Sequence, residues 1–478
     1  MSPVLGLLLA AALGAADFRP TPAHPVGFRG DWTGRYTGAQ PPLHWSPTNN
    51  VAWKTEVGVG ESSPVVVGNR IFILTDGVRI RCLDRRDGAV LWERDRHLRA
   101  DVPVEAALLP VEDYVRRYHQ WCAGKGKGAH WDVARRELGE PPATVSCGGQ
   151  PNRYWSQSPL AYAIATPCSD GRNLYVWLPT GVLVAYDLEG HRQWTRVLGD
   201  QRVGGGWWGA HVAPSPLLAD GKLVVHYDKI YCVEAATGNL LWTQNQRVLP
   251  IPSPVAGQAG GEWCVALGTL QILRLRDGQY VHGDERGGHH DSVGVGSPVF
   301  FEGMVSWTSH TVALPAATGG EAKLAWELDA DTAGKMTQYN HVPRPATGKP
   351  YHLRGMGWHG YASPVVHDGR FYYHHEGALL SALDAATGAW QWTKQLKDGH
   401  RSCGGAVYPS LTLAGPCLYA TGGGGVTFVM RVGAEPEFQI VAVNQLDDLG
   451  GNALVFSGRD LFAHAGRWLY CIREETNR

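Results

Sequence analysis

The sequence lacks the features that mark several large classes of protein. It carries 43 Lys and Arg against 44 Asp and Glu, a net charge of -1 over 478 residues, so no overall attraction to nucleic acid or to an anionic membrane is expected. No basic stripe interleaved with aromatic residues is present, and we predict no nucleic-acid partner. Beyond the N-terminal run, no apolar stretch is long enough for a transmembrane helix.

Familiar catalytic motifs are also missing. The sequence has no G-x-S-x-G nucleophile elbow, no G-x-x-x-x-G-K-[ST] phosphate loop and no H-E-x-x-H metal motif. The glycine run 422–425 lacks the lysine and the strand–turn–helix context of a phosphate cradle, so we interpret it as a turn. No complete catalytic set is found.

Cysteine is present without an adjacent pair. The count is nine, so at least one cysteine has no partner within the chain. Cys122 and Cys147 lie in one irregular segment and are the predicted disulfide. Cys82, Cys232 and Cys471 occupy the same place in a repeated strand, and we interpret them as small buried apolar residues.

The N-terminus is typical of a secretory leader. Val4 to Ala16 is apolar and ends in small residues, which predicts a signal peptide over residues 1–16 and cleavage before Asp17. No cysteine adjoins the predicted cleavage site, so a lipid anchor is not expected. We therefore predict a soluble, exported protein, periplasmic or secreted, with an N-terminal extension over residues 17–48.

Glycine and tryptophan are abundant, with 61 and 19 residues, and both recur in a repeated pattern. In each copy, a small residue and usually a proline open a short apolar strand, which a Gly, Asn or Asp turn joins to a second strand. Eight copies begin at Ser62, Ala165, Pro214, Pro252, Gly296, Ala362, Tyr408 and Asn452.

A third and a fourth strand complete each copy. The third ends in Asp or Glu before a glycine turn, and the fourth carries a tryptophan, as in "ALDAATGAWQW" at Ala382 to Trp392. Four short strands repeated eight times predict an all-β fold, an eight-bladed β-propeller of four-stranded antiparallel blades over residues 49–478. The last copy has no fourth strand, and "NNVAWKTEV" at Asn49 to Val57 is expected to supply it and close the ring.

The recurring tryptophans are predicted to be structural. A bulky residue at one place in six units is expected to dock one blade on the next, with its indole N–H bonded to the backbone of the neighbour's glycine turn. The predicted docking residues are Trp53, Trp92, Trp194, Trp242, Trp326 and Trp392.

Two segments interrupt the repeat. Residues 96–153 separate the first two blades, and helical spacing predicts a small helical insertion of two short helices there. Residues 328–360 separate blades five and six and are predicted to form a long loop. Such segments either carry function or pack on the rim, and the sequence leaves both readings open.

The segments that enter the first strands lie beside the central channel of a propeller, and here they are rich in Gly, His, Trp and Asp. Convergent polar groups and aromatic rings are typical of a ligand site. The predicted site residues are Glu61, Trp207, Trp208, His211, His289, His290, Asp291, Trp358, His359 and His400. His289, His290 and Asp291 are also candidate ligands for zinc, copper, iron or nickel. The alternatives are a polar small-molecule or glycan site and a purely structural role.

The paired motif, Ser-Pro at the start and A-x-D-x-x-T-G-x-x-x-W at the end, resembles the pyrroloquinoline quinone (PQQ) repeat. "FRGDWTGRYTG" followed by "VAWKTEVGVGESSPVV" is similar to exported PQQ-like propellers of planctomycete-type bacteria, and the resemblance covers Phe28 to Ile472. The fold group includes quinoprotein alcohol dehydrogenases and BamB, the propeller scaffold of outer-membrane barrel assembly. The resemblance implies the fold more strongly than a function.

The resemblance to quinoprotein dehydrogenases implies a calcium held by Glu and Asn, a catalytic Asp, a tryptophan floor and often an adjacent cysteine pair. This sequence lacks that pair, and no residue aligns with the calcium ligands, although Trp207 or Trp208 could serve as the floor. We therefore predict a non-catalytic, monomeric binding or scaffold protein for an envelope protein, a glycan or a small molecule. The alternative is an oxidoreductase acting on an alcohol or sugar, dependent on a metal or on PQQ with calcium.

Overall fold

A computed structural model gives the fold, and it describes most of the repeated strands and the segment before them. The described residues are 20–21, 24–58, 60, 62–75, 79–94, 117, 121, 131–139, 165–178, 181–198, 214–245, 252–284, 296–307, 310–317, 320–337, 362–375, 378–399, 401–402, 409–422, 425–432, 439–446 and 452–474.

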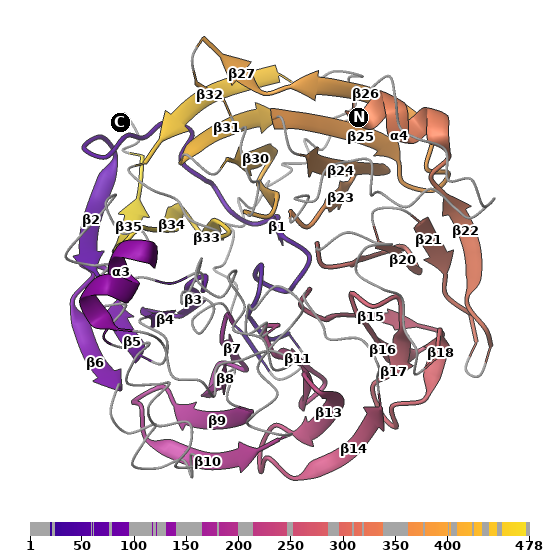
Figure 1. Ribbon diagram of the computed structural model, residues 1–478, viewed down its shortest axis with the longest axis horizontal. Coiled ribbons are helices and arrows are strands. Elements are labelled where there is room, and N and C mark those ends of the chain that lie inside the picture. Colours follow the sequence, from indigo (N-terminus) through magenta and orange to yellow (C-terminus); the bar gives the residue numbers. More distant parts are fainter. Residues whose placement is uncertain are drawn as a thin grey trace, which may run out of the picture.

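Eight sheets stand around one axis, with the first strand of each repeat on the inner side (Figure 1). Seven have four antiparallel strands, and the sheet of blade seven has the same four and a fifth, parallel strand, β1 (Arg35–Tyr36). The predicted eight-bladed propeller is therefore confirmed. Blades one and two are β3 (Val65–Val67), β4 (Arg70–Thr75), β5 (Arg79–Asp84), β6 (Val90–Arg94), and β7 (Cys168–Ser169), β8 (Asn173–Leu178), β9 (Val182–Asp187), β10 (Arg192–Val197). Blades three and four are β11 (Leu217–Ala219), β12 (Lys222–His226), β13 (Lys229–Glu234), β14 (Leu240–Asn245), and β15 (Val255–Ala259), β16 (Glu262–Ala266), β17 (Ile272–Arg274), β18 (Tyr280–His282).

The remaining blades follow the same order. Blades five and six are β19 (Val299–Phe301), β20 (Met304–Trp307), β21 (His310–Ala313), β22 (Lys323–Glu327), and β23 (Val365–His367), β24 (Arg370–His375), β25 (Leu379–Asp384), β26 (Trp390–Gln395). Blades seven and eight are β29 (Thr412–Ala414), β30 (Cys417–Thr421), β31 (Val426–Arg431), β32 (Gln439–Gln445), and β33 (Val455–Ser457), β34 (Asp460–Ala465), β35 (Trp468–Ile472), β2 (Val51–Glu56). A short hairpin, β27 (Lys397–Asp398) and β28 (Arg401–Ser402), follows blade six.

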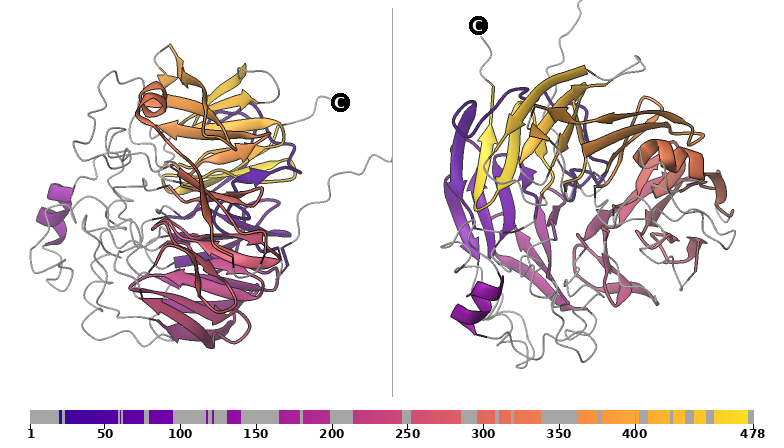
Figure 2. Two further views of the ribbon diagram at one scale, coloured as in Figure 1. Left: turned by 90° about the vertical axis from the view of Figure 1, so that its right-hand side faces the viewer. Right: turned by 45° about the horizontal axis from the view of Figure 1, so that its top comes forward.

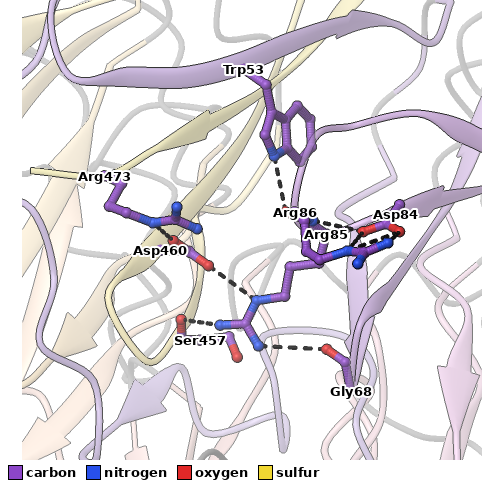
Figure 3. Close-up of polar contacts among 8 residues, drawn as sticks. All are labelled: Trp53, Gly68, Asp84, Arg85, Arg86, Ser457, Asp460 and Arg473. Carbon is purple, nitrogen blue, oxygen red and sulfur yellow. Dashed lines mark hydrogen bonds and ion pairs between the residues drawn. The ribbon is translucent and has the colours of Figure 1, made fainter.

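The ring is closed by the N-terminal strand, as the sequence predicted. β2 pairs antiparallel with β35 and forms the outer edge of blade eight. A polar lock joins this blade to blade one (Figure 3): the Arg85 Nε donates to Asp460 at 3.0 Å, and an Arg85 Nη donates to the Ser457 carbonyl at 2.8 Å. The Arg473 Nε donates to the other oxygen of the buried Asp460 at 2.6 Å. The last blade is thus tied to the first by charge as well as by packing.

The repeated tryptophans lie between adjacent blades. Five indole N–H groups donate to a carbonyl in the glycine turn of the next blade: Trp53 to Arg85 (2.9 Å), Trp92 to Leu188 (2.9 Å), Trp194 to Ala235 (3.0 Å), Trp242 to Leu275 (2.9 Å) and Trp326 to Ala385 (2.9 Å). Trp392 packs in a cluster with Leu413 and Leu418 of blade seven. The turn of that blade, residues 433–438, lies outside the described residues.

The glycine of each turn supports the neighbouring indole. A Cβ added at Gly388 would lie 2.6 Å from Cε3 of Trp326, and Gly388 has a φ of +72°. A small residue on the adjacent strand pairs with the tryptophan: Cys82 pairs with Trp92, Cys232 with Trp242, and Cys471 with Trp53. These three cysteines are free and buried, which agrees with their interpretation as small apolar residues.

A chain of hydroxyl contacts links the innermost strands. In five blades, the hydroxyl oxygen of the residue just before the first strand's proline, or of its equivalent in blade seven, accepts from a backbone N–H of the previous blade. The contacts are Ser63 N to Thr166 Oγ1 (3.1 Å), Thr166 N to Ser215 Oγ (2.9 Å), Ser215 N to Ser253 Oγ (3.0 Å), Ser297 N to Ser363 Oγ (3.0 Å) and Ser363 N to Ser410 Oγ (3.2 Å). Since all these residues are buried, the hydroxyls satisfy N–H groups that water does not reach.

Among the described residues, the helices α3 (Trp131–Leu138) and α4 (Ala330–Thr337) lie in the interrupting segments. α3 lies in the predicted helical insertion and stands off one face of the ring (Figure 2). α4 occupies residues predicted to form a loop, so that prediction was wrong for this part. The Asp329 carboxylate caps the helix by accepting from the Thr332 N–H at 2.7 Å, and the buried Met336 anchors it on blade six. No helix in the described portion of the chain is long and apolar enough to cross a membrane.

Candidate functional site at the ring axis

The residues predicted to bind a ligand cannot be placed by the structure. Glu61, Trp207, Trp208, His211, His289, His290, Asp291, Trp358, His359 and His400 all lie outside the described residues. Cys122 and Cys147, the predicted disulfide, lie outside them as well. The described part of the site consists of the strand ends beside these segments and of residues 24–46, here called the axial segment.

The axial segment runs along the innermost strands of the ring (Figure 1). The first strand of each blade has one unpaired edge, and backbone groups on such an edge need partners. Val26 forms a bridge with Ser169 of blade two, and β1 (Arg35–Tyr36) pairs in parallel with β29 of blade seven. The chain thus covers its own inner edges in these two blades.

Two side chains of this segment bind further inner carbonyls. The Trp32 Nε1 donates to the Ala256 carbonyl of blade four at 2.7 Å. One Arg29 Nη donates to the carbonyls of Pro364 at 2.6 Å and Leu411 at 3.1 Å. Those two carbonyls directly precede the first strands of blades six and seven. In the sequence, this segment indicated only a family resemblance, and the roles of Arg29 and Trp32 were not predicted.

The axial segment and the residues just before it also touch the turns at one end of the ring. A Cβ added at Gly171, in the turn after the first strand of blade two, would lie 2.2 Å from the carbonyl oxygen of Pro20. In blade eight, the Gln40 N–H donates to the carbonyl of Gly458 in the corresponding turn at 2.8 Å. The opposite end, where the first strand of each blade begins, is called the mouth below.

Arg29 is buried, and the hydroxyl of the half-buried Tyr36 is also shielded from solvent. Arg29 is 1% exposed, and burial lowers the pKa of its guanidinium to about 10. Burial likewise raises the pKa of the Tyr36 phenol above its usual range. Arg29 therefore stays charged and Tyr36 stays neutral at pH 7.

A polar cluster holds the chain where it enters blade one. The hydroxyl of Thr75 donates to the carbonyl of Val57 at 2.5 Å, and a guanidinium nitrogen of Arg81 contacts the same oxygen. The Nε2 of His464 lies 2.9 Å from the carbonyl oxygen of Gly58. These buried side chains stand at strand ends of the mouth, and the sequence analysis did not predict them.

Buried histidines recur at the mouth end of the second strands. His226, His374 and His464 face Ile230, Leu380 and Leu469 across blades three, six and eight, so they occupy equivalent places. Burial lowers the pKa of His374 to about 3 and keeps the ring neutral. A register count along the repeated strands could have found this signal, because each histidine lies four residues after the start of its strand.

The predicted metal site stays a prediction, because its candidate ligands His289, His290 and Asp291 lie outside the described residues. No three His, Cys, Asp or Glu side chains in the described ranges stand close enough together to hold a metal ion. Arg29 is a buried cation in the axial segment, and a cation suits an anion rather than calcium.

Comparison with known proteins identifies the family. The profile described as outer membrane protein assembly factor BamB matches residues 16–127, 150–247 and 179–435. The chain belongs to the PQQ-like family of BamB. No curated protein matches the chain.

Solved propellers resemble this PQQ-like chain along most of its length. A europium-containing methanol dehydrogenase is 12% identical, with a TM-score of 0.53, and the match covers 92% of this chain and 88% of that one. Quinohemoprotein alcohol dehydrogenase from Comamonas testosteroni is 11% identical, with a TM-score of 0.53 over 98% and 83%. BamB from Moraxella catarrhalis is 11% identical, with a TM-score of 0.49 over 89% and 99%. At these identities, the two dehydrogenases share the fold, and the fold does not carry their activity to this chain.

Proposed function

We propose that this PQQ-like propeller is an exported, non-catalytic binding protein that holds an envelope protein partner at its mouth. The observation that carries the proposal is the axial segment, which contacts the turns at one end of the ring while Arg29 reaches the mouth from within. We therefore place the partner at the other end of the ring, the mouth, which lies beside the predicted site residues.

Two further points support a binding role. The family model carries the description of an outer membrane protein assembly factor, and a factor that assembles proteins must bind them. At the mouth, Thr75, Arg81 and His464 hold the entering backbone of blade one, which gives the adjacent segments a rigid base. Binding surfaces on loops supported in this way are common among repeat scaffolds.

Site-specific photo-crosslinking in the cells that make the protein tests the proposal. A photoreactive amino acid replaces Trp208 or Trp358 at the predicted mouth, and as a control replaces Leu240, which is 55% exposed on the outer strand β14. We expect both mouth positions to crosslink to the same envelope protein and Leu240 to give none. Crosslinks from Leu240 alone would place the partner on the rim and contradict the proposal.

A variant experiment separates binding from stability. Replacing His289, His290 and His359 by Ala should abolish the crosslink and leave the melting temperature unchanged. A large fall in melting temperature would instead give these histidines a structural role. A second experiment mixes the purified protein with PQQ and calcium. Stoichiometric uptake of the quinone, together with dye-linked oxidation of an alcohol, would contradict the binding proposal and support the oxidoreductase hypothesis.

A further inference from the structure

Buried hydrogen-bond donors without acceptors collect in the axial segment. One Arg29 nitrogen binds two carbonyls, but its Nε and its other Nη have no hydrogen-bond partner within the described ranges and are shielded from solvent. The Tyr36 hydroxyl is also buried without a partner among the described residues. Buried polar groups are normally paired, so unpaired donors point to an acceptor that belongs there.

The carboxylate nearest in sequence, Asp31, attracts the Arg29 charge, but no hydrogen bond or ion pair joins the two side chains. Asp31 is exposed, and its Oδ1 accepts from the N–H and the hydroxyl of Thr33 at 3.2 and 2.5 Å. The two backbone carbonyls offer partial negative charge only. Since a buried cation is costly unless it is paired, the expected acceptor carries a negative charge.

The guanidinium is fixed in place by the backbone. A Cβ added at Gly34 would lie 2.3 Å from the Arg29 nitrogen that binds the carbonyls, and Gly34 has a φ of +73°, which favours glycine. Glycine therefore lets the main chain lie against the guanidinium. A fixed cation with free N–H groups is the arrangement that anion sites use.

We propose that a compact anion, a halide or the carboxylate of a small organic acid, binds to Arg29 on the ring axis. The anion accepts from the free nitrogens of Arg29 and joins the axial segment to the first strands of blades six and seven, where Pro364 and Leu411 already bind the same side chain. This inference does not rest on the proposed partner, since a bound anion would stabilise the ring whether or not a protein binds at the mouth.

Thermal unfolding of the full chain tests the site. Sodium gluconate, whose anion is bulky, is replaced stepwise by sodium chloride or sodium formate at constant ionic strength. We expect the melting temperature to rise and then saturate, as binding to the folded state requires. Arg29→Gln should remove the saturable rise, and Arg29→Lys, which keeps the charge but not the guanidinium N–H groups, should weaken apparent affinity about tenfold or more.

Trp32→Phe is the matched control. It removes the 2.7 Å bond to Ala256 from the same segment and leaves the Arg29 nitrogens in place, so the protein should be less stable but respond to chloride as the wild type does. Crystals of the wild-type protein grown in bromide give a second readout that needs no variant, with an anomalous peak expected beside Arg29.

Each result of these experiments either supports or overturns the proposed anion site. A saturable response in wild type and Trp32→Phe, absent in Arg29→Gln, supports the site, as does a bromide peak beside Arg29. Equal responses in wild type and Arg29→Gln mean an adventitious ion only, and a wild type that does not respond means that water satisfies Arg29. Either result overturns the inference.

Discussion

The glycine turns that support the docking tryptophans permit a sharply controlled test. Gly388 and Gly369 lie in the same blade and have nearly the same φ, +72° and +69°. A Cβ at Gly388 would lie 2.6 Å from Cε3 and 2.7 Å from Cδ2 of Trp326, whereas a Cβ at Gly369 meets no atom within 4 Å. Replacing each by Ala therefore imposes the same backbone strain, and only one replacement disturbs the junction between blades.

The expected magnitudes follow from the contacts. An Ala in the left-handed region costs roughly 1–2 kcal/mol, which both variants share. Gly388→Ala also displaces the buried indole, at about 1–3 kcal/mol for overpacking. The displaced indole loses its bond to the Ala385 carbonyl, which adds about 1 kcal/mol. The free energy of unfolding should thus fall by about 2–4 kcal/mol more in Gly388→Ala than in Gly369→Ala.

Urea unfolding followed by tryptophan fluorescence and by circular dichroism measures the difference. Gly238 and Gly221 form a second pair, with φ values of +70° and +68°, because a Cβ at Gly238 would lie 2.6 Å from Trp194 and one at Gly221 meets nothing within 4 Å. If the two variants of each pair lose the same free energy of unfolding within about 0.5 kcal/mol, the close packing of the glycine turn against the neighbouring indole does not stabilise the junction, and the reasoning is refuted.

Three further results are expected. Arg85→Met leaves the Asp460 carboxylate with Arg473 alone, so unfolding in urea should show a loss of about 3 kcal/mol that Arg85→Met with Asp460→Leu largely recovers. Ser363→Ala leaves the buried N–H of Ser297 without its acceptor and should cost about 1–3 kcal/mol in the same assay, whereas Thr33→Ala, at a half-buried turn, should cost less. Burial lowers the pKa of His374 to about 3, so the unfolded state binds the extra proton and stability falls with pH from 6.5 toward 3. Between pH 7 and pH 5, the free energy of unfolding of His374→Leu should therefore fall by about 2 kcal/mol less than that of the wild type. A variant with the same pH profile as the wild type would contradict a neutral buried ring.

The fold could be predicted because the same short sequence signals recur in successive blades. The Ser-Pro start, the glycine turns and the fourth-strand tryptophan recur, and the missing strand of the last copy reappears at Asn49 to Val57. Repetition turns weak propensities into a strong pattern. α4 was missed because Gly334 and the nearby prolines favour a loop, while the Asp329 cap and the burial of Met336 depend on blade six.

The axial site could not be predicted in the same way, because it does not repeat. Arg29 and Trp32 bind carbonyls that are 335 and 224 residues away in sequence, at Pro364 and Ala256. No periodicity links such pairs. The motif "FRGDWTGR" contributed only to the family resemblance, and its contacts form only when the eight blades stand in a ring.

The closing strand also fixes the order in which the protein can form. His464 and Gly58 meet across a separation of 406 residues, and β2 reaches β35 only after nearly the whole chain is available. Seven blades can assemble from local contacts, but the eighth must wait for both ends, and contacts of such range form slowly. A chain emerging N-terminus first would therefore carry β2 unpaired until β35 appears, and the polar lock between Arg85 and Asp460 would complete the ring in a final step.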